Sequence, residues 1–183
     1  VQNETGRGVA TTLIRELGPV LSALMVSGRV GSSISAELGS MVVSQQIEAM
    51  RALGTSPVRK LVTPRVTALL VSLPLLTVVA DILGILGGGM VATMVFGLDT
   101  DTYFTSVKAG VGVRDIIGGA IKPIFFALII GIVSCHRGLN TEGGTVGVGR
   151  ATTSAVVTSS IAIIVADFFL SKLLQTLLGI SSI

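Results

Sequence analysis

Four long apolar stretches constrain the fold of this chain more than any other feature. A helix needs about 20 mostly apolar residues to cross a hydrocarbon layer about 30 Å thick. Stretches of that length with at most two charged residues each cover about 17–36, 66–98, 116–135 and 151–178. We therefore predict an all-α membrane protein with four visible spans, in a single transmembrane domain over residues 1–183.

The second stretch, 66–98, is long for one crossing and short for two. Glycines at positions 84, 87, 88 and 89 lie in its second half. Missing side chains weaken a helix and allow close backbone approach. We expect the segment to tilt, break or protrude there, with the Gly84 and Gly88 pair spaced like a helix contact face.

The composition excludes several classes of protein. Half of the residues are hydrophobic, 13% are charged and the mean hydropathy is +0.86, so a polar shell for a soluble domain is missing. One Cys and one His cannot form an internal disulfide or a metal site by themselves. The formal net charge of +3 is not gathered into one basic stripe, and stacking aromatics are scarce, so we expect no nucleic-acid partner.

No sequence of the GxxxxGK[ST] type, which cradles phosphates in many nucleotide-binding proteins, occurs in the chain. The single His136 follows the third span without an acidic residue placed beside it. We therefore expect no catalytic residue and no cofactor in this chain. ATP and Mg²⁺ would be bound, and ATP hydrolysed, by a separate subunit.

The loops indicate an orientation. Residues 37–65 hold four Lys and Arg, residues 99–115 hold two against three Asp, and residues 136–152 hold two. Cytoplasmic loops carry an excess of Lys and Arg, so the first and third loops are predicted to be cytoplasmic. Both ends of the sequence then lie on the outer side.

A polar segment within 38–54, between the first two spans, has the pattern of an amphipathic surface helix. Gly54 can end such a helix in a left-handed conformation. The spacing is similar to the cytoplasmic coupling motif of ABC-transporter permeases, which docks on an ATPase subunit. The residues of this predicted contact are Glu48, Ala49, Met50, Arg51, Leu53 and Gly54. The alternative is a helix that lies on the lipid headgroups without a protein partner.

Ionisable residues inside or at the mouths of the spans each need a partner or a water-filled cavity, because burial in hydrocarbon costs about 3 kcal/mol. They are Arg15, Glu16, Arg29, Asp81, Lys122 and Asp167. Glu16, Lys122 and Asp167 all fall in the outer half, where opposite charges can meet as a cluster. Arg29 and Asp81 lie deeper and need other partners.

This cluster has two interpretations. In the first, it lines or gates a cavity that holds a lipid tail, with Arg15 and Glu16 at its mouth and apolar walls from the first span. The predicted walls are Leu17, Leu21, Leu24 and Met25. In the second, the ion pairs only fix the register of the helices.

Four separated motifs carry a family resemblance over nearly the whole chain. They are RELGPV from Arg15, SGRVGSSISAELG from Ser27, SLPLLTV from Ser72 and RATTSAVVTSS from Arg150. In this order they resemble the MlaE-type permeases of the MCE lipid-transport systems. Arg15, Glu16 and Leu17 match the family's RELGP helix at the lipid-binding cavity, and Lys122 and Asp167 match its intramembrane charges.

The resemblance implies a multi-pass homodimer in the bacterial inner membrane, bound to a cytoplasmic ABC ATPase dimer and, outside, to a hexamer of MCE-domain proteins. Some such systems add a STAS-domain subunit. Family members move phospholipids between the inner membrane and the outer envelope, which maintains the lipid asymmetry of the outer membrane. The family has five spans and an amino-terminal interfacial helix, so we expect the interfacial helix and the first span to be missing here.

The sequence also departs from importer-type permeases, because Gly54 is not followed by their Ile-x-Leu-Pro ending. An ion-coupled secondary transporter of a hydrophobic solute is the alternative function, with Glu16, Asp81 and Asp167 as proton carriers. The absence of an evident internal repeat argues against it. A membrane scaffold without transport activity is a third hypothesis.

Overall fold

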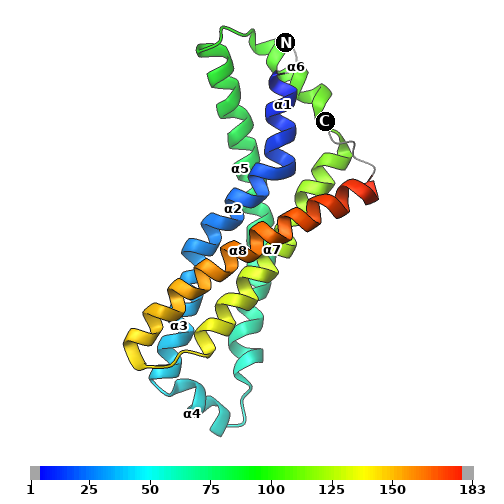
Figure 1. The fold of residues 1–183 in the computed structure, drawn as a ribbon. Helices are drawn as coiled ribbons and strands as arrows, with labels where there is room; N and C mark the ends of the chain where they lie inside the picture. Colours follow the sequence, from blue (N-terminus) through cyan, green and yellow to red (C-terminus); the bar gives the residue numbers. More distant parts are fainter. Residues whose placement is uncertain (1–4, 179–183) are drawn as a thin grey trace.

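The helices of this protein follow one another with short connections, and the computed structural model describes residues 5–178 (Figure 1). In chain order they are α1 (Thr5–Thr12), η2 (Leu13–Leu17), α2 (Gly18–Val26), η3 (Ser27–Gly31), α3 (Ser32–Val43), α4 (Gln46–Ala52), η4 (Val58–Val62), α5 (Thr63–Met94), α6 (Thr100–Gly110), α7 (Val113–Leu139) and α8 (Gly144–Leu178). The η elements are π-helical turns within longer helical runs. No strand occurs in the described range, and the predicted all-α class is confirmed.

Four helical runs are long and apolar enough to cross a membrane, as the sequence predicts. They cover Gly6–Val43, Val58–Met94, Val113–Leu139 and Gly144–Leu177. The first run begins well before the predicted boundary at residue 17. Polar residues in this extension interrupt the apolar pattern from which the span was predicted. In the structure the Thr11 hydroxyl is paired with the helix backbone, because it donates to the Arg7 carbonyl at 2.8 Å.

Helix α7 is the centre of the bundle, since it packs against α2, α3, α5 and α8. Its fully buried side chains, Phe126 and Ile130, join Leu38, Leu73 and Ile163 in one apolar core. Small residues let neighbours approach closely. A Cβ at Gly138, for example, would lie 2.8 Å from the Leu38 Cβ atom of α3.

Helix α5 runs unbroken through its glycines, so the break considered in the sequence analysis does not occur. With η4 it forms a run of 37 residues, which is about 55 Å long and exceeds the hydrocarbon layer. The glycines serve as contact points instead. A Cβ at Gly84 would lie 3.2 Å from Leu13, and one at Gly89 would lie 3.0 Å from the ring of Tyr103.

Tyr103 joins α6 to α5, because its hydroxyl donates a hydrogen bond to the Ile85 carbonyl at 3.1 Å. Burial raises the pKa of the Tyr103 phenol above its usual value. Helix α6 also packs against α1. Most of the segment between the second and third spans is therefore an ordered helix.

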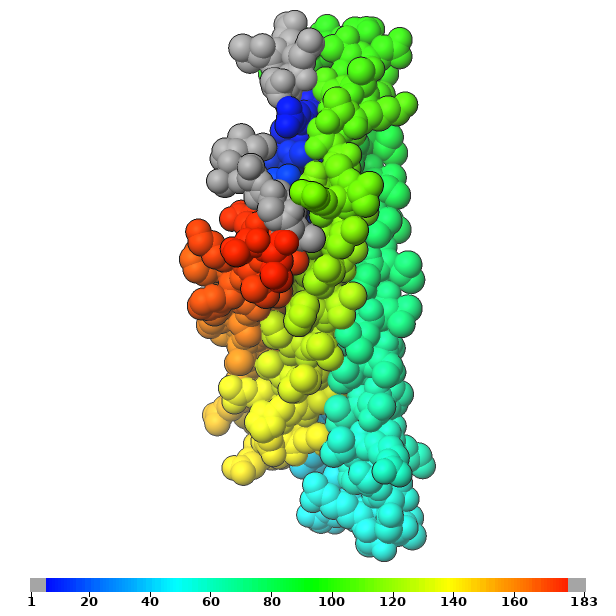
Figure 2. All heavy atoms as spheres, turned by 90° about the vertical axis from the view of Figure 1, so that its right-hand side faces the viewer, coloured from blue at the N-terminus to red at the C-terminus, as the bar shows by residue number. Residues whose placement is uncertain are grey.

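The two ends of the bundle differ (Figure 1). Helix α4 and the connection between α7 and α8 lie at one end, and α6 lies at the other. Figure 2 shows α5 and α7 side by side along the molecule. This arrangement agrees with a common side for the first and third loops, and the assignment of that side to the cytoplasm stays a prediction.

Candidate functional site

A charged cluster joins η2, α7 and α8. The Lys122 Nζ atom lies 2.6 Å from Glu16 Oε2 and 3.0 Å from Asp167 Oδ1, and the Lys122 side chain is only 3% exposed. The structure thus brings together the three charges that the sequence analysis expected to meet. Lys122 lies nine residues after Val113, the first residue of α7, or about 14 Å along the helix from the end near α6.

The RELGP motif explains one contact of this cluster. Pro19 has no N–H, so the carbonyl four residues earlier, that of Arg15, loses its usual helical donor. Lys122 Nζ donates to this Arg15 carbonyl at 2.8 Å. The ammonium therefore compensates a backbone group that Pro19 leaves unpaired, and it ties the π-helical turn η2 to α7.

Ser171 of α8 completes the cluster. Its hydroxyl accepts from Lys122 Nζ at 2.8 Å and donates to the Glu16 carboxylate, 3.1 Å from Oε2. The pocket beside these groups is about 30 Å³, room for about one water. The sequence analysis missed Ser171, although its position four residues after Asp167 places it on the same face of one helix.

Arg15 pairs with a residue that the sequence analysis treated only as a loop charge. Its Nε and Nη2 atoms lie 2.8 and 2.6 Å from Asp115 Oδ1. Asp115 Oδ2 also accepts the Gly112 N–H at 2.9 Å, which caps the start of α7. An Asp three residues after Gly112, at the beginning of an apolar run, is the signal that would have placed it in the first turn of a helix.

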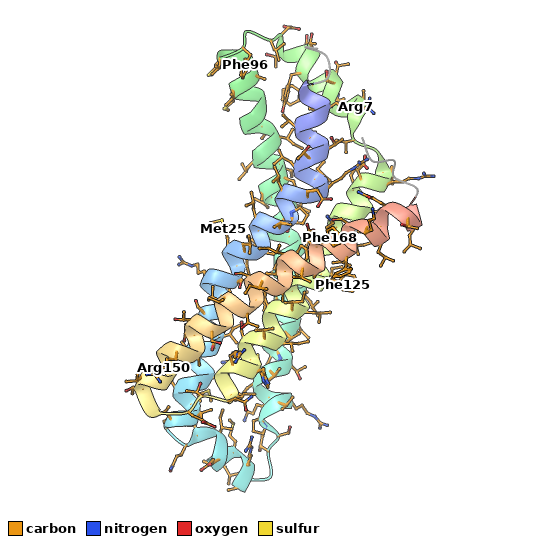
Figure 3. The ribbon with its side chains drawn as sticks, viewed as in Figure 1. Arg7, Met25, Phe96, Phe125, Arg150 and Phe168 are labelled. Atoms are coloured by element: carbon orange, nitrogen blue, oxygen red, sulfur yellow. The ribbon has the colours of Figure 1, made fainter. Side chains whose placement is uncertain are left out.

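The predicted apolar walls do not line the pocket at the cluster, so a cavity with those walls is not formed within this chain alone. Leu17, Leu21 and Met25 are 44%, 54% and 78% exposed and, at a spacing of four residues, form one outward stripe. Figure 3 shows Met25 on the outer side of α2. Leu24 packs, half-buried, against the apolar core. Ala23 and Val26 of α2 are buried in that core, which turns the stripe away from it.

Arg29 and Asp81 do not join the cluster. Arg29 lies in η3, is exposed and forms no ion pair with any side chain in residues 5–178. Asp81 lies in the middle of α5 with its carboxylate against Gly18, where an added Cβ would collide with it. Its Oδ1 atom is buried and has no hydrogen-bond donor among the described residues.

Within the segment 38–54, which was predicted to hold the coupling helix, α4 (Gln46–Ala52) forms a separate short helix after a left-handed Gln45 with φ 58°. Residues 38–43 belong to α3. Gly54 has φ +73°, which confirms the predicted left-handed end of the segment. Ile47 is buried and anchors α4 to the bundle.

The outer face of α4 is open. The exposed side chains and backbone positions are Glu48, Ala49, Arg51, Leu53 and Gly54, while Met50 is half-buried. Leu53 is 82% exposed at the tip of the segment. Behind it, an ion pair of 3.0 Å between Arg65 and Glu37 joins the start of α5 to α3. The segment is therefore a short projection on which the charged Glu48 and Arg51 and the apolar Leu53 are available for contact.

Within residues 5–178, no group of three or more His, Cys, Asp or Glu side chains is placed to hold a metal ion. The cluster has only two carboxylates, and both are paired with the Lys122 ammonium. The arrangement is thus suited to positioning helices and to presenting a shielded polar surface within a membrane.

Comparison with known proteins gives a consistent family assignment. A family model described as "Permease MlaE" matches residues 1–173. A probable ABC transporter permease protein of Rickettsia typhi is 42% identical over 173 residues, and one of Synechocystis is 40% identical over 169 residues. The alignments cover 94% and 92% of this chain, and 67% and 64% of these relatives.

A plant relative is similar over the same region. The chloroplastic protein TRIGALACTOSYLDIACYLGLYCEROL 1 of Arabidopsis thaliana is 40% identical over 167 residues, which is 91% of this chain and 48% of that protein. This chain therefore spans about two thirds of the length of the bacterial relatives and about half of the plant one.

Proposed function

Because this chain belongs to the MlaE permease family, we propose that it is the membrane-spanning subunit of an ABC-type phospholipid transporter. The observation that carries this proposal is the placement of two features at different levels of one four-span bundle. The Lys122 cluster lies within the spans on the side of α6, and α4 projects from the opposite end.

The α4 projection is proposed to dock on a cytoplasmic ABC ATPase dimer, which binds ATP and Mg²⁺. Leu53 would fill an apolar cleft of that subunit, and Glu48 and Arg51 would set its orientation. Since Ile47 anchors α4 and the Arg65–Glu37 ion pair lies behind it, a push on α4 is passed to α3 and α5. Closure of the ATPase would thereby move the first span.

The exposed stripe of Leu17, Leu21 and Met25 is proposed to face a second copy of the chain. Two such stripes would enclose an apolar cavity beneath the polar clusters around Arg15 and Glu16. The tail region is then apolar and the headgroup region polar, which matches the two parts of a phospholipid. The name of the Arabidopsis relative is that of a glycolipid, which supports a lipid as the cargo.

The proposed setting is the inner membrane of a bacterium, with an MCE-domain hexamer on the outer side and, in some assemblies, a STAS-domain subunit. The transporter would move phospholipids between this membrane and the outer envelope, which maintains outer-membrane lipid asymmetry. An apolar cavity of this kind accepts a lipid from either side, so it would serve transport in either direction.

Native mass spectrometry of the gently solubilised complex, purified through this chain, tests the assembly. We expect two copies of the chain with two ATPase subunits, an MCE hexamer and a retained phospholipid. Recovery of this chain without an ATPase would contradict the proposal. Transport in liposomes that depends on a proton gradient and not on ATP would favour the ion-coupled alternative.

Mutation of the docking segment tests the coupling step separately. A variant with Glu48 and Gly54 replaced should lose the ATPase in pull-down experiments. The matched control is replacement of Arg29, an exposed residue of the first span far along the chain from α4. Unchanged association of the ATPase with the docking variant would exclude α4 as the contact.

A further inference from the structure

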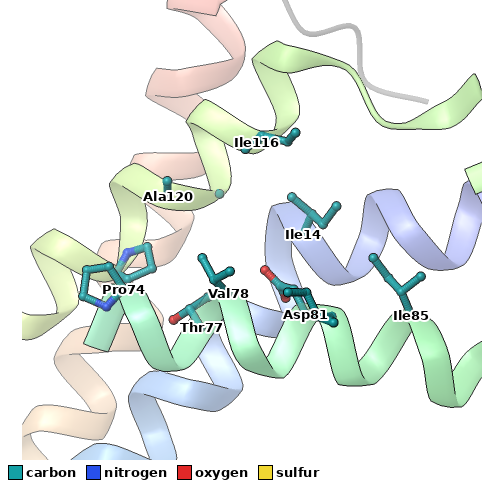
Figure 4. Close-up of a pocket in the computed structure, with 11 residues that line it drawn as sticks. Ile14, Pro74, Thr77, Val78, Asp81, Ile85, Ile116 and Ala120 are labelled. Carbon is teal, nitrogen blue, oxygen red and sulfur yellow. The ribbon is translucent and has the colours of Figure 1, made fainter. Parts of the chain in front are cut away.

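A second crevice, separate from the Lys122 cluster, lies between η2, α5 and α7 (Figure 4). Its volume is about 220 Å³. The walls are almost entirely apolar and include Ile14 of η2, Val78, Ile82 and Ile85 of α5, and Ile116 of α7. None of its lining residues lines the pocket at the cluster.

One carboxylate lies in this apolar wall. Figure 4 shows the Asp81 side chain directed between Ile14 and Val78. Its buried Oδ1 atom has no donor among residues 5–178, and the nearby Thr77 hydroxyl donates to the Leu73 carbonyl at 2.9 Å and not to Asp81. A carboxylate in such surroundings is costly unless a cation or a donor pairs with it.

The cations of the neighbouring cluster are already engaged. Arg15 pairs with Asp115, and Lys122 pairs with Glu16 and Asp167. On the side of α2, the residue against the Asp81 carboxylate is Gly18, which has no side chain to donate a hydrogen bond. Within residues 5–178, Asp81 Oδ1 is thus left without a donor, and a cationic group of a molecule in the crevice would compensate it.

The chemistry of the wall narrows the class of that molecule. Metal cations such as Ca²⁺ take six to eight oxygen ligands, whereas this crevice is lined almost wholly by carbon. A volume of about 220 Å³ is also below the roughly 300–1,000 Å³ of pockets for drug-sized ligands, so two acyl chains do not fit. An apolar body with one chain and one small cationic head does.

We propose that this crevice binds a single-chain amphiphile whose ammonium head pairs with Asp81 and whose tail lies along Val78, Ile82 and Ile85. Thr77, four residues before Asp81 on the same face of α5, also lines the crevice, and its hydroxyl keeps lone pairs that can accept.

This assignment does not rest on the transport proposal. The crevice and the Lys122 cluster use different residues, so each can fail while the other holds. They are neighbours through η2, in which Ile14 lines the crevice while Arg15 and Glu16 belong to the charged network.

Photolabelling of the purified protein in nanodiscs of phosphatidylcholine tests the site. The probe is a decylammonium ion with a diazirine on its tail, and the control probe is the corresponding uncharged decanol. We expect labels on α5 between residues 78 and 85 and on α7 between residues 116 and 123. In Asp81→Asn, labelling by the ammonium probe should fall at least tenfold, while labelling by the alcohol stays unchanged.

Two further variants keep the test decisive. Ile82→Trp keeps the carboxylate but fills the crevice, and it should also reduce labelling by the ammonium probe at least tenfold. Phe169→Ala alters a different apolar groove, between α7 and α8, and should leave labelling of the crevice unchanged. Circular dichroism of each variant verifies that its helices are retained.

Three results would overturn the assignment. Equal labelling of Asp81→Asn and the wild-type protein by the ammonium probe would show that Asp81 does not bind the head. Labels confined to the α7–α8 groove would place the ligand elsewhere. Loss of labelling when phosphatidylethanolamine replaces phosphatidylcholine would identify a two-chain lipid as the occupant and refute the single-chain assignment.

Discussion

Replacement of Lys122 by Met is expected to destabilise the folded protein by about 4 kcal/mol. Removal of one partner from a buried ion pair costs about 3–5 kcal/mol, and the lower end applies because the Glu16 side chain is 42% exposed. The Arg15 carbonyl also loses its donor, which Pro19 cannot replace, and this adds about 1 kcal/mol. Met keeps the length of the side chain, so the change isolates the charge.

Thermal unfolding followed by far-ultraviolet circular dichroism in nanodiscs is the suitable assay, because the chain has no Trp and one Tyr. For a chain of 183 residues, a loss of about 4 kcal/mol corresponds to a fall in Tm of about 8–16 °C. The matched control is Lys172→Met, since Lys172 is exposed and neighbours the cluster residue Ser171 on α8. Its Tm should change little.

A compensated variant separates the loss of a pair from the loss of a packed side chain. When Glu16→Gln and Asp167→Asn are added to Lys122→Met, no carboxylate is left uncompensated, so much of the lost stability should return. An unchanged Tm for Lys122→Met, or a triple variant no more stable than the single one, would refute the electrostatic reasoning. Undiminished lipid transport by a correctly assembled Lys122→Met variant would leave the cluster with a structural role only.

Three further changes have definite expected outcomes. Gly119→Ala should lower the stability of the fold by about 1–3 kcal/mol, because the added Cβ would collide with the Ile14 carbonyl. Gly87→Ala has open space around the added Cβ and should raise the stability by up to about 1 kcal/mol. Thermal unfolding of both variants verifies the contrast. Gly54→Ala should lower the local stability at the end of α4 by about 1–2 kcal/mol, because φ at this residue is +73°. Faster hydrogen exchange confined to this segment would report the loss. Leu53→Asp should leave Tm within about 1 °C, since the side chain is 82% exposed, but abolish ATP-driven lipid transport; a transport rate equal to that of the wild-type protein would contradict the docking proposal.

Much of the fold followed from the sequence, because lipid imposes a strict rule on a chain. Every backbone polar group inside hydrocarbon has to be paired, so apolar stretches of sufficient length are predicted to be helices, as they are here. The same rule makes isolated charges conspicuous, which is why Glu16, Lys122 and Asp167 stood out as a group before their contacts were known. The left-handed end at Gly54 was predictable for a local reason, since glycine is favoured at positive φ.

Two features of the molecule depend on contacts between helices, which the sequence does not display. Of the tilt, break or protrusion expected at the glycines of α5, the break does not occur, because Leu13 and Tyr103 pack into the space that those glycines leave. The proposed walls Leu17, Leu21 and Met25 point away from the cluster because Ala23 and Val26 hold the other face of α2 in the core.

The sequence by itself determined the class of the protein, its four spans and the identity of the charges inside them. These depend on composition and on spacing along the chain, which the sequence displays directly. The tertiary structure alone decided the pairing of Arg15 with Asp115, the use of the Arg15 carbonyl by Lys122, and the isolation of Asp81 in an apolar crevice. Each depends on how three helices are rotated against one another, and that rotation is set by close packing around α7 and not by any local pattern of residues.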